Sequence, residues 1–145
     1  MTTVQSRREF HLDRATYDEM IEHAHSDFPY EVCGLLAGHD ERLTAHYRIP
    51  NAARSMTFYN MDPTAMLRAM NEMEDHEWDL LAIYHSHTHT AAYPSATDIE
   101  LAFYADAVYL IVSLQDADRP HIRAFDIVDG TVTERTLLVD GEQLW

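Results

Sequence analysis

The segment from Ala107 to Leu114 constrains the fold more than any other part of the chain. It reads Ala-Val-Tyr-Leu-Ile-Val-Ser-Leu, so nearly every position is apolar. A strand that is apolar on both faces needs cover on both faces, which places it in the interior of a sheet. We therefore expect a layered protein built around a central strand in this segment.

The flanking sequence supplies further strands and the helices that cover them. Alternating or apolar patterns predict strands over 8–12, 31–37, 42–49, 56–59, 80–84, 121–128 and 131–139. Residues 38–40 are predicted as a turn, and Asp129-Gly130 as the turn of a closing hairpin. Helices are predicted over 14–27, over 63–75, and in a short stretch that opens at Thr97 or Asp98. These elements predict a mixed α/β or α+β sheet of six or seven strands flanked by helices, in one domain over residues 1–145.

The charge balance excludes two classes of partner. The chain has 25 acidic and 10 basic residues, a net charge of −15, which disfavours binding to nucleic acid and to anionic membranes.

No apolar run approaches the roughly 18 residues of a membrane span, and the N-terminus lacks the apolar core of a signal peptide. We therefore expect a cytoplasmic protein. Cys33 is the single cysteine, so an internal disulfide is impossible.

All the basic residues are arginine, and two explanations for the absence of lysine stay open. One is the acidic, lysine-poor composition of proteins from salt-loving organisms. The other is that an enzyme acting on lysine conjugates avoids becoming conjugated itself. The first explanation predicts that added salt, which screens self-repulsion, stabilises the fold.

Two histidines follow the predicted strand 80–84. Because His85 and His87 are two positions apart, they project to the same side of an extended segment and can reach one metal ion. Asp98 follows eleven positions after His87, far enough for a loop to bring its carboxylate back. Two histidines, one carboxylate and an open fourth position describe a catalytic zinc site.

Other metal sites fit this pattern less well. Cupin barrels also use His-x-His, but they place a glutamate a few residues later, where this chain has Thr88 to Ala92. Zinc deaminases need a Cys-x-x-Cys pair, which one cysteine cannot supply.

A zinc hydrolase also needs a base, and Glu31 is the candidate because it opens an otherwise apolar strand. The alternative for Glu31 is a solvent-facing residue at the end of that strand. Ser95, three positions before Asp98, either caps the following helix or directs its hydroxyl at a reaction oxyanion.

Glu31 lies in Glu-x-Cys-Gly-Leu-Leu-x-Gly, and His85-Ser86-His87 is followed by seven residues, Ser95, and two more before Asp98. This set resembles the signature of the JAMM/MPN+ zinc metalloproteases, above all the short prokaryotic members. Those include archaeal desampylases, which remove ubiquitin-like modifiers, and peptidases that release cysteine from a sulfur-carrier protein. The segment 51–59 is also similar to that group. Many eukaryotic members have proline where this chain has Thr88, a position at which the short members vary.

The resemblance implies a curved sheet between helices, related to cytidine deaminases, and a single catalytic Zn²⁺ held by His85, His87 and Asp98. It implies that Glu31 is the general base and then acid, and that Ser95 stabilises the oxyanion. It implies cleavage of an isopeptide bond at the C-terminus of a ubiquitin-like modifier. Two alternatives stay open: release of a C-terminal cysteine or short peptide from a sulfur carrier, and a non-enzymatic interaction domain stabilised by metal.

Three further expectations concern the surroundings of the site. The segments 51–60 and 88–96 are expected to line a groove for the modifier tail, which pairs with a strand edge. His89 is expected to be a solvent-facing loop residue rather than a metal ligand. Cys33 is expected to be a small buried hydrophobe rather than a nucleophile.

Overall fold

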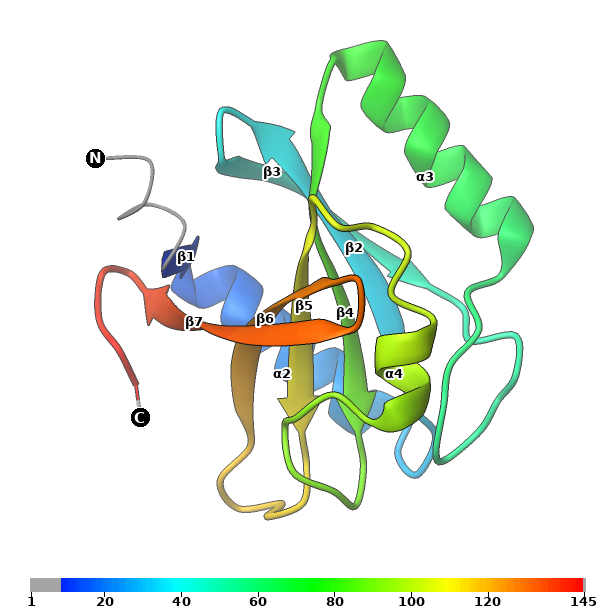
Figure 1. The fold of residues 1–145 in the computed structure, drawn as a ribbon, viewed down its shortest axis with the longest axis vertical. Helices are drawn as coiled ribbons and strands as arrows, with labels where there is room; N and C mark the ends of the chain where they lie inside the picture. Colours follow the sequence, from blue (N-terminus) through cyan, green and yellow to red (C-terminus); the bar gives the residue numbers. More distant parts are fainter. Residues whose placement is uncertain (1–8, 145) are drawn as a thin grey trace.

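A computed structural model describes residues 9–144 and contains one seven-stranded mixed sheet in the order β1-β7-β6-β5-β4-β2-β3 (Figure 1). The strands are β1 (Glu9–Leu12), β2 (Cys33–His39), β3 (Arg42–Ile49), β4 (Asp79–His87), β5 (Val108–Ser113), β6 (His121–Val128) and β7 (Thr131–Val139). The helices are α2 (Arg14–Ser26), α3 (Pro63–His76) and α4 (Ala96–Glu100). The predicted fold class is confirmed.

The apolar segment that anchored the prediction forms the middle of the sheet. All six residues of β5 are buried. The strand runs parallel to β4 on one side and antiparallel to β6 on the other. The crossover between β4 and β5 carries α4, which brings the residues after His87 back to the sheet.

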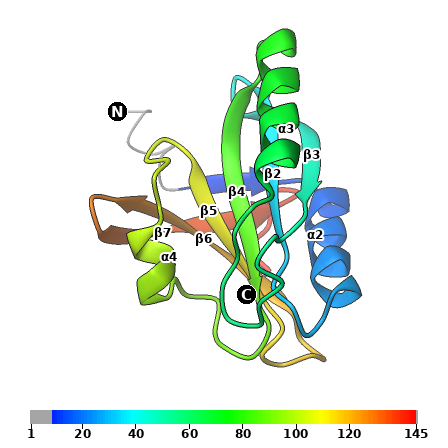
Figure 2. The same cartoon turned by 90° about the vertical axis from the view of Figure 1, so that its right-hand side faces the viewer.

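Two apolar layers cover the two faces of the sheet. On one face, Tyr17, Met20 and Ala24 of α2 join the core. On the other, Ala69 and Met73 of α3 pack into the second core. Figure 2 shows α2 and α4 on opposite sides of the sheet.

Gly34 allows an aromatic ring to cross β2. A Cβ atom at this position would lie 2.2 Å from the ring of Tyr84. The space lets the Tyr84 hydroxyl reach His23 Nδ1 of α2 and His46 Nε2 of β3, each at 2.7 Å. These two hydrogen bonds connect α2 and β3 to β4, the strand that also carries His85 and His87.

Most predicted elements agree with the structure, and β3, β6 and β7 have the predicted bounds. β1 begins at Glu9, and the predicted first residue, Arg8, lies outside the described residues, as does the N-terminal segment that was compared with signal peptides. β4 continues beyond the predicted end at Tyr84 to His87, because parallel pairing with β5 extends as far as His87↔Ser113.

Three predictions were wrong in detail. The turn predicted at 38–40 falls at Asp40 and Glu41, both with positive φ, while Gly38 and His39 stay paired in β2. The strand predicted over 56–59 is absent. The segment lies in a closed loop, and the Phe58 carbonyl and the Asn60 N–H form hydrogen bonds with the Asn51 side chain rather than with a neighbouring strand. β2 begins at Cys33 rather than at Glu31.

Among residues 9–144, no helix is long and apolar enough to cross a membrane.

Candidate metal centre

The C-terminal end of β4 brings two imidazole side chains together. His85 and His87 have 1% and 4% of their surface exposed, and their Nε2 atoms lie 3.1 Å apart. The alternation of the strand points Ser86, between them, toward the opposite face. The two histidines therefore converge on one point at the end of a buried strand, as their spacing predicted.

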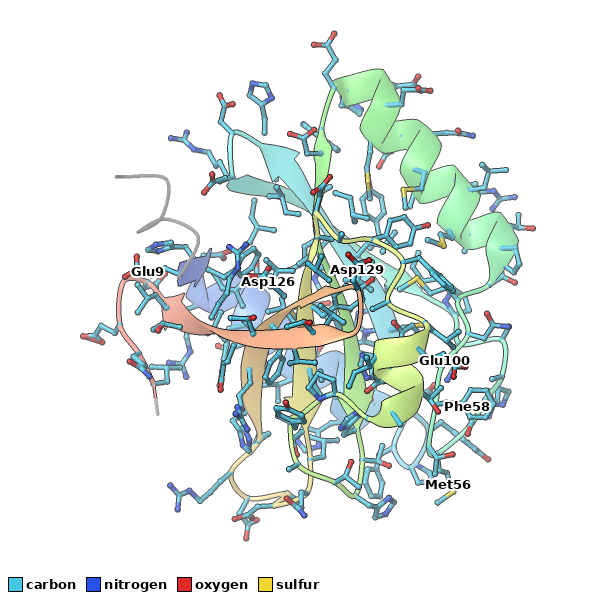
Figure 3. All side chains as sticks on the ribbon, viewed as in Figure 1. Glu9, Met56, Phe58, Glu100, Asp126 and Asp129 are labelled. Carbon is cyan, nitrogen blue, oxygen red and sulfur yellow. The ribbon has the colours of Figure 1, made fainter. Side chains whose placement is uncertain are left out.

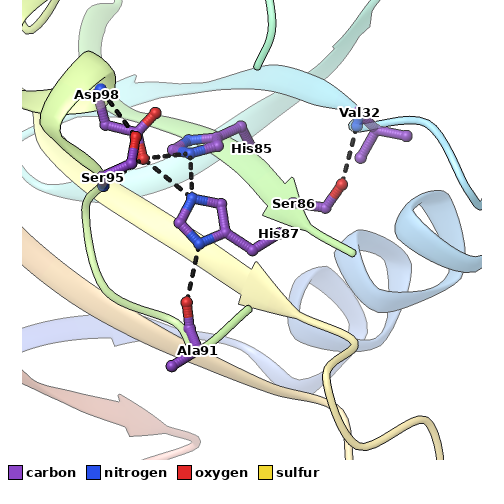
Figure 4. Close-up of polar contacts among 7 residues, drawn as sticks. All are labelled: Val32, His85, Ser86, His87, Ala91, Ser95 and Asp98. Carbon is purple, nitrogen blue, oxygen red and sulfur yellow. Dashed lines mark hydrogen bonds and ion pairs between the residues drawn. The ribbon is translucent and has the colours of Figure 1, made fainter. Parts of the chain in front are cut away.

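Asp98 completes the cluster from the first turn of α4. Its Oδ2 atom lies 3.0 Å from His85 Nε2 and 2.9 Å from His87 Nε2 (Figure 4). The Ser95 backbone N–H donates to the same oxygen at 2.9 Å, and the Asp98 N–H donates to Ser95 Oγ at 3.1 Å. This capping box fixes the carboxylate against the histidines.

The arrangement fits a divalent metal ion. Two imidazole nitrogens and one carboxylate oxygen are the ligand set of a catalytic zinc site with an open position. The His87 Nδ1–H donates to the Ala91 carbonyl at 2.8 Å, so in the neutral imidazole Nε2 is the nitrogen whose lone pair could bind a metal ion. The Tyr59 ring stacks on His85 with centroids 4.6 Å apart and holds that imidazole from the side. These contacts orient both histidines without using their converging nitrogens.

The cluster is strongly polarised. Burial alone would raise the pKa of Asp98, but the hydrogen bonds to His85 and His87 outweigh it and hold that pKa far below its ordinary value. Burial lowers the pKa of His85. Burial also acts to lower the pKa of His87, yet the contacts with Asp98 and Ala91 raise it overall. Asp98 is therefore a carboxylate at neutral pH, as a metal ligand must be.

Glu31 lies two residues before β2, where its carboxyl group interacts electrostatically with His87 and Asp98. It is only 3% exposed, and Oε1 has no hydrogen-bond partner among the described residues. Burial raises the pKa of Glu31 to about 8; the charge of His87 acts to lower this pKa, and the charge of Asp98 makes a smaller contribution that raises it. The alternative of a solvent-facing glutamate is wrong, because the strand end is covered. A buried carboxyl group without a partner is costly to the fold and is typical of a functional residue.

Ser95 adopts the first of its two predicted roles, as the N-cap of α4. The helix opens at Ala96, slightly earlier than predicted, because Ser95 rather than Thr97 or Asp98 is the cap. Its hydroxyl accepts the Asp98 N–H, and that bond leaves the hydroxyl proton free to be donated.

A largely apolar pocket of about 280 Å³ adjoins Asp98. Its lining includes Phe58, Tyr59, Met66, Leu101, Phe103 and Tyr104. Figure 3 shows Phe58 near α4, on the same side of the molecule as Glu100. Of the two segments predicted to line a groove, 51–60 contributes to this pocket and 88–96 does not. Sequence reasoning missed 101–104, whose signal was an apolar, aromatic run directly after the helix that carries Asp98.

His89 and Cys33 behave as predicted. The His89 side chain is exposed, hydrogen-bonds to Thr88 Oγ1 at 2.9 Å and packs against the Phe28 ring, so it does not join the cluster. The Cys33 thiol is buried and donates to the Ile49 carbonyl at 3.3 Å. Burial raises the pKa of Cys33 to about 12, which leaves no thiolate for nucleophilic attack at neutral pH.

A buried His-x-His strand end and an aspartate in the first turn of a capped helix form a cluster that could hold a metal ion. Comparison with known proteins identifies the family of the chain. The model of the prokaryotic homologs of the JAB domain matches residues 13–128. The chain belongs to this family.

Named relatives share much of the sequence. The CysO-cysteine peptidase of Mycobacterium tuberculosis is 46% identical over 122 residues, which are 83% of this chain and 84% of that protein. The desampylase of Haloferax volcanii is 37% identical over 103 residues, 66% of this chain and 74% of that protein. The solution structure of a protein from Desulfitobacterium hafniense superposes with a TM-score of 0.80 at 33% identity, covering 92% of this chain and 94% of that one.

Proposed function

We propose that the protein is a zinc-dependent peptidase that cleaves the amide bond at the C-terminal end of a small ubiquitin-like modifier or sulfur-carrier protein. One observation carries the proposal: a His85–His87–Asp98 cluster with the converging atoms of a metal site lies beside a buried, unpartnered Glu31. Membership of the JAB family and the named peptidase relatives support it. A cytoplasmic location is part of the proposal and fits the free thiol of Cys33.

Each residue has a role in hydrolysis. His85, His87 and Asp98 hold the ion, which supplies a Lewis acid and an acidified water when bound. Glu31 takes the proton of the attacking water and passes it to the leaving amine. Burial raises the pKa of Glu31 in the metal-free protein, and the charge of a bound cation would lower that pKa toward the working pH, where a base is most effective. The Ser95 hydroxyl donates its free proton to the developing oxyanion.

The apolar pocket beside Asp98 is the proposed seat for the substrate tail. An extended chain that lies between 58–61 and 101–104 presents its last carbonyl to the metal cluster, because Asp98 itself lines the pocket. Aromatic and leucine side chains at the rim are exposed, so they are available to an apolar residue of the tail.

Two bonds are candidates for cleavage. The carrier–cysteine bond is favoured by the 46% identity with CysO-cysteine peptidase over 83% of this chain. The isopeptide bond to a lysine is the second candidate, supported by the desampylase relative. A non-enzymatic domain is disfavoured because it offers no reason to retain an unpartnered buried carboxyl group.

The test is cleavage by the purified, zinc-loaded protein of two substrates, a sulfur-carrier protein extended by one C-terminal cysteine and a modifier–lysine isopeptide. Cleavage of the first alone assigns a cysteine-releasing peptidase, and cleavage of the second alone assigns an isopeptidase. Cleavage of neither, in protein shown to bind zinc, would favour the interaction domain.

A further inference from the structure

The side-chain amide of Asn51 forms all of its hydrogen bonds with other groups of the protein. Nδ2 donates to the Glu31 carbonyl at 3.0 Å and to the Phe58 carbonyl at 3.2 Å. Oδ1 accepts the backbone N–H groups of Ala53 at 3.0 Å and Asn60 at 2.9 Å. An asparagine amide has two N–H donors and one acceptor oxygen with two lone pairs, so these four bonds satisfy it completely.

Two of these bonds, with the backbone, close the loop 51–61 between β3 and α3. The Ala52 N–H donates to the Asn60 carbonyl at 2.8 Å, and Asn51 pairs with Met61 in an isolated bridge. Phe58 and Tyr59, inside this loop, form one wall of the apolar pocket. The conformation of that wall therefore depends on Asn51.

The same residue holds the backbone that carries Glu31. The Glu31 carbonyl is bound by Asn51, and its N–H donates to the carbonyl of Ser55 in the loop 51–61 at 2.8 Å. On the other side, the neighbouring Val32 N–H donates to Ser86 Oγ at 2.8 Å (Figure 4). The Ser86 N–H donates to the Val32 carbonyl at 3.0 Å. Hydrogen bonds from the loop 51–61 on one side and from β4 on the other therefore hold the backbone of residues 31–32 in place.

These backbone hydrogen bonds matter because the carboxyl group of Glu31 is not itself held by hydrogen bonds in the described part of the chain. Oε1 has no hydrogen-bond partner among the described residues, so no hydrogen bond to that oxygen corrects a displacement of the backbone from which the side chain starts. A shift of about 1 Å at a reacting group costs about 100-fold in rate.

We infer that Asn51 is a positioning residue, which sets Glu31 and the Phe58–Tyr59 wall of the pocket in one fixed relation. Through Asn51, the loop that contacts the substrate tail and the base that acts on the scissile bond form one unit. Asn51 touches neither the metal ligands nor the reacting atoms. The inference rests on the proposed peptidase function and adds to it a residue outside the signature of five.

The experiment compares Asn51→Asp and Asn51→Ser with the wild type and with Asn71→Asp, which makes the same charge change at an exposed position of α3. Asn51→Asp keeps the acceptor oxygen and removes both donors, and Asn51→Ser keeps a short hydroxyl, so one variant guards against failure of the other to fold. Zinc content, thermal melting, kcat and KM are measured on the carrier–cysteine and isopeptide substrates. Both Asn51 substitutions are also made in a Glu31→Gln background.

We expect folded Asn51 variants to bind zinc as the wild type does, since the three ligands come from β4 and α4. We expect kcat to fall by about 10- to 100-fold, the usual cost of losing a residue that orients a site. In the Glu31→Gln background the further fall in kcat should vanish, because Asn51 acts through Glu31, while any rise in KM persists.

Three outcomes are decisive. An unchanged kcat in a folded, zinc-loaded Asn51 variant would overturn the inference. An equal fall in kcat with and without Glu31 would also overturn it, since that marks a merely structural role. A wild type that cleaves neither substrate would instead remove the proposed function, which separates the two failures.

Discussion

Replacing Glu31 by glutamine should stabilise the metal-free protein, and the gain should depend on pH. Burial raises the pKa of Glu31 from 4.5 to about 8. Between these values the unfolded chain ionises the carboxyl group, while the folded protein keeps it protonated. The stability that the group contributes is therefore fully present below pH 4.5 and is lost as pH rises through about 8.

The size of the effect follows from the same shift. One pKa unit corresponds to about 1.4 kcal/mol. The free energy of unfolding of the wild type is therefore lower than that of a protein whose side chain at this position cannot ionise, by about 1 kcal/mol at pH 5 and about 3 kcal/mol at pH 7. Any fixed cost of placing an amide at this position is the same at both pH values. The stability of Glu31→Gln relative to wild type should therefore rise by about 2 to 3 kcal/mol between pH 5 and pH 7.

Urea unfolding in the presence of EDTA measures this difference. The matched control is Glu100→Gln, an exposed glutamate on α4, whose stability relative to wild type should stay within about 0.5 kcal/mol at both pH values. A Glu31→Gln difference that does not change with pH would show that Glu31 titrates normally. The argument for a destabilised, functional carboxyl group would then fail.

Three further predictions concern the metal, the pocket and the surface charge. His87→Ala should abolish stoichiometric zinc binding, as measured by metal analysis after gel filtration, because it removes one of three ligands from the chain; retained zinc would contradict the assignment. Leu101→Asp should raise KM for a carrier–cysteine substrate by at least about 10-fold with less effect on kcat, because it places a charge in the apolar pocket; an unchanged KM would remove the pocket from substrate binding. Melting temperature should rise between low and molar KCl, because salt screens the repulsion of a chain with net charge −15; a flat response would count against a salt-adapted composition.

Local chemistry made most of the fold predictable. The apolar run 107–114 could only be a central strand, and Asp129-Gly130 fixed the closing hairpin. The misplaced turn at 38–40 and the absent strand at 56–59 had different causes. Gly38 suggested a turn, yet pairing with β4 and β3 keeps it extended. Segment 56–59 has strand-forming residues, but it pairs with no strand among the described residues. Asn51 instead donates to the Phe58 carbonyl within it and accepts the Asn60 N–H just after it.

The site was predictable where spacing carries geometry. Two histidines at alternate positions must share a face of a strand, and Asp98 three residues after a capping serine must lie in the first turn of a helix. The role of Asn51 could not be read from the sequence, because its four bonds join residues as far apart as Glu31 and Asn60. The contact of Tyr84 with His23 and His46 was hidden for the same reason, since it depends on the space above Gly34.

The most direct test of the central claim is one cleavage assay, followed by mass spectrometry of the carrier–cysteine and isopeptide substrates. It uses zinc-loaded wild type, the same protein stripped with EDTA, and zinc-loaded Glu31→Gln. We predict that the loaded wild type releases the carrier or modifier. We predict that stripped protein does not until Zn²⁺ is restored, and that Glu31→Gln binds one zinc but is slower by about 100-fold or more. Full cleavage by the metal-free protein, or an unchanged rate in Glu31→Gln, would contradict the account.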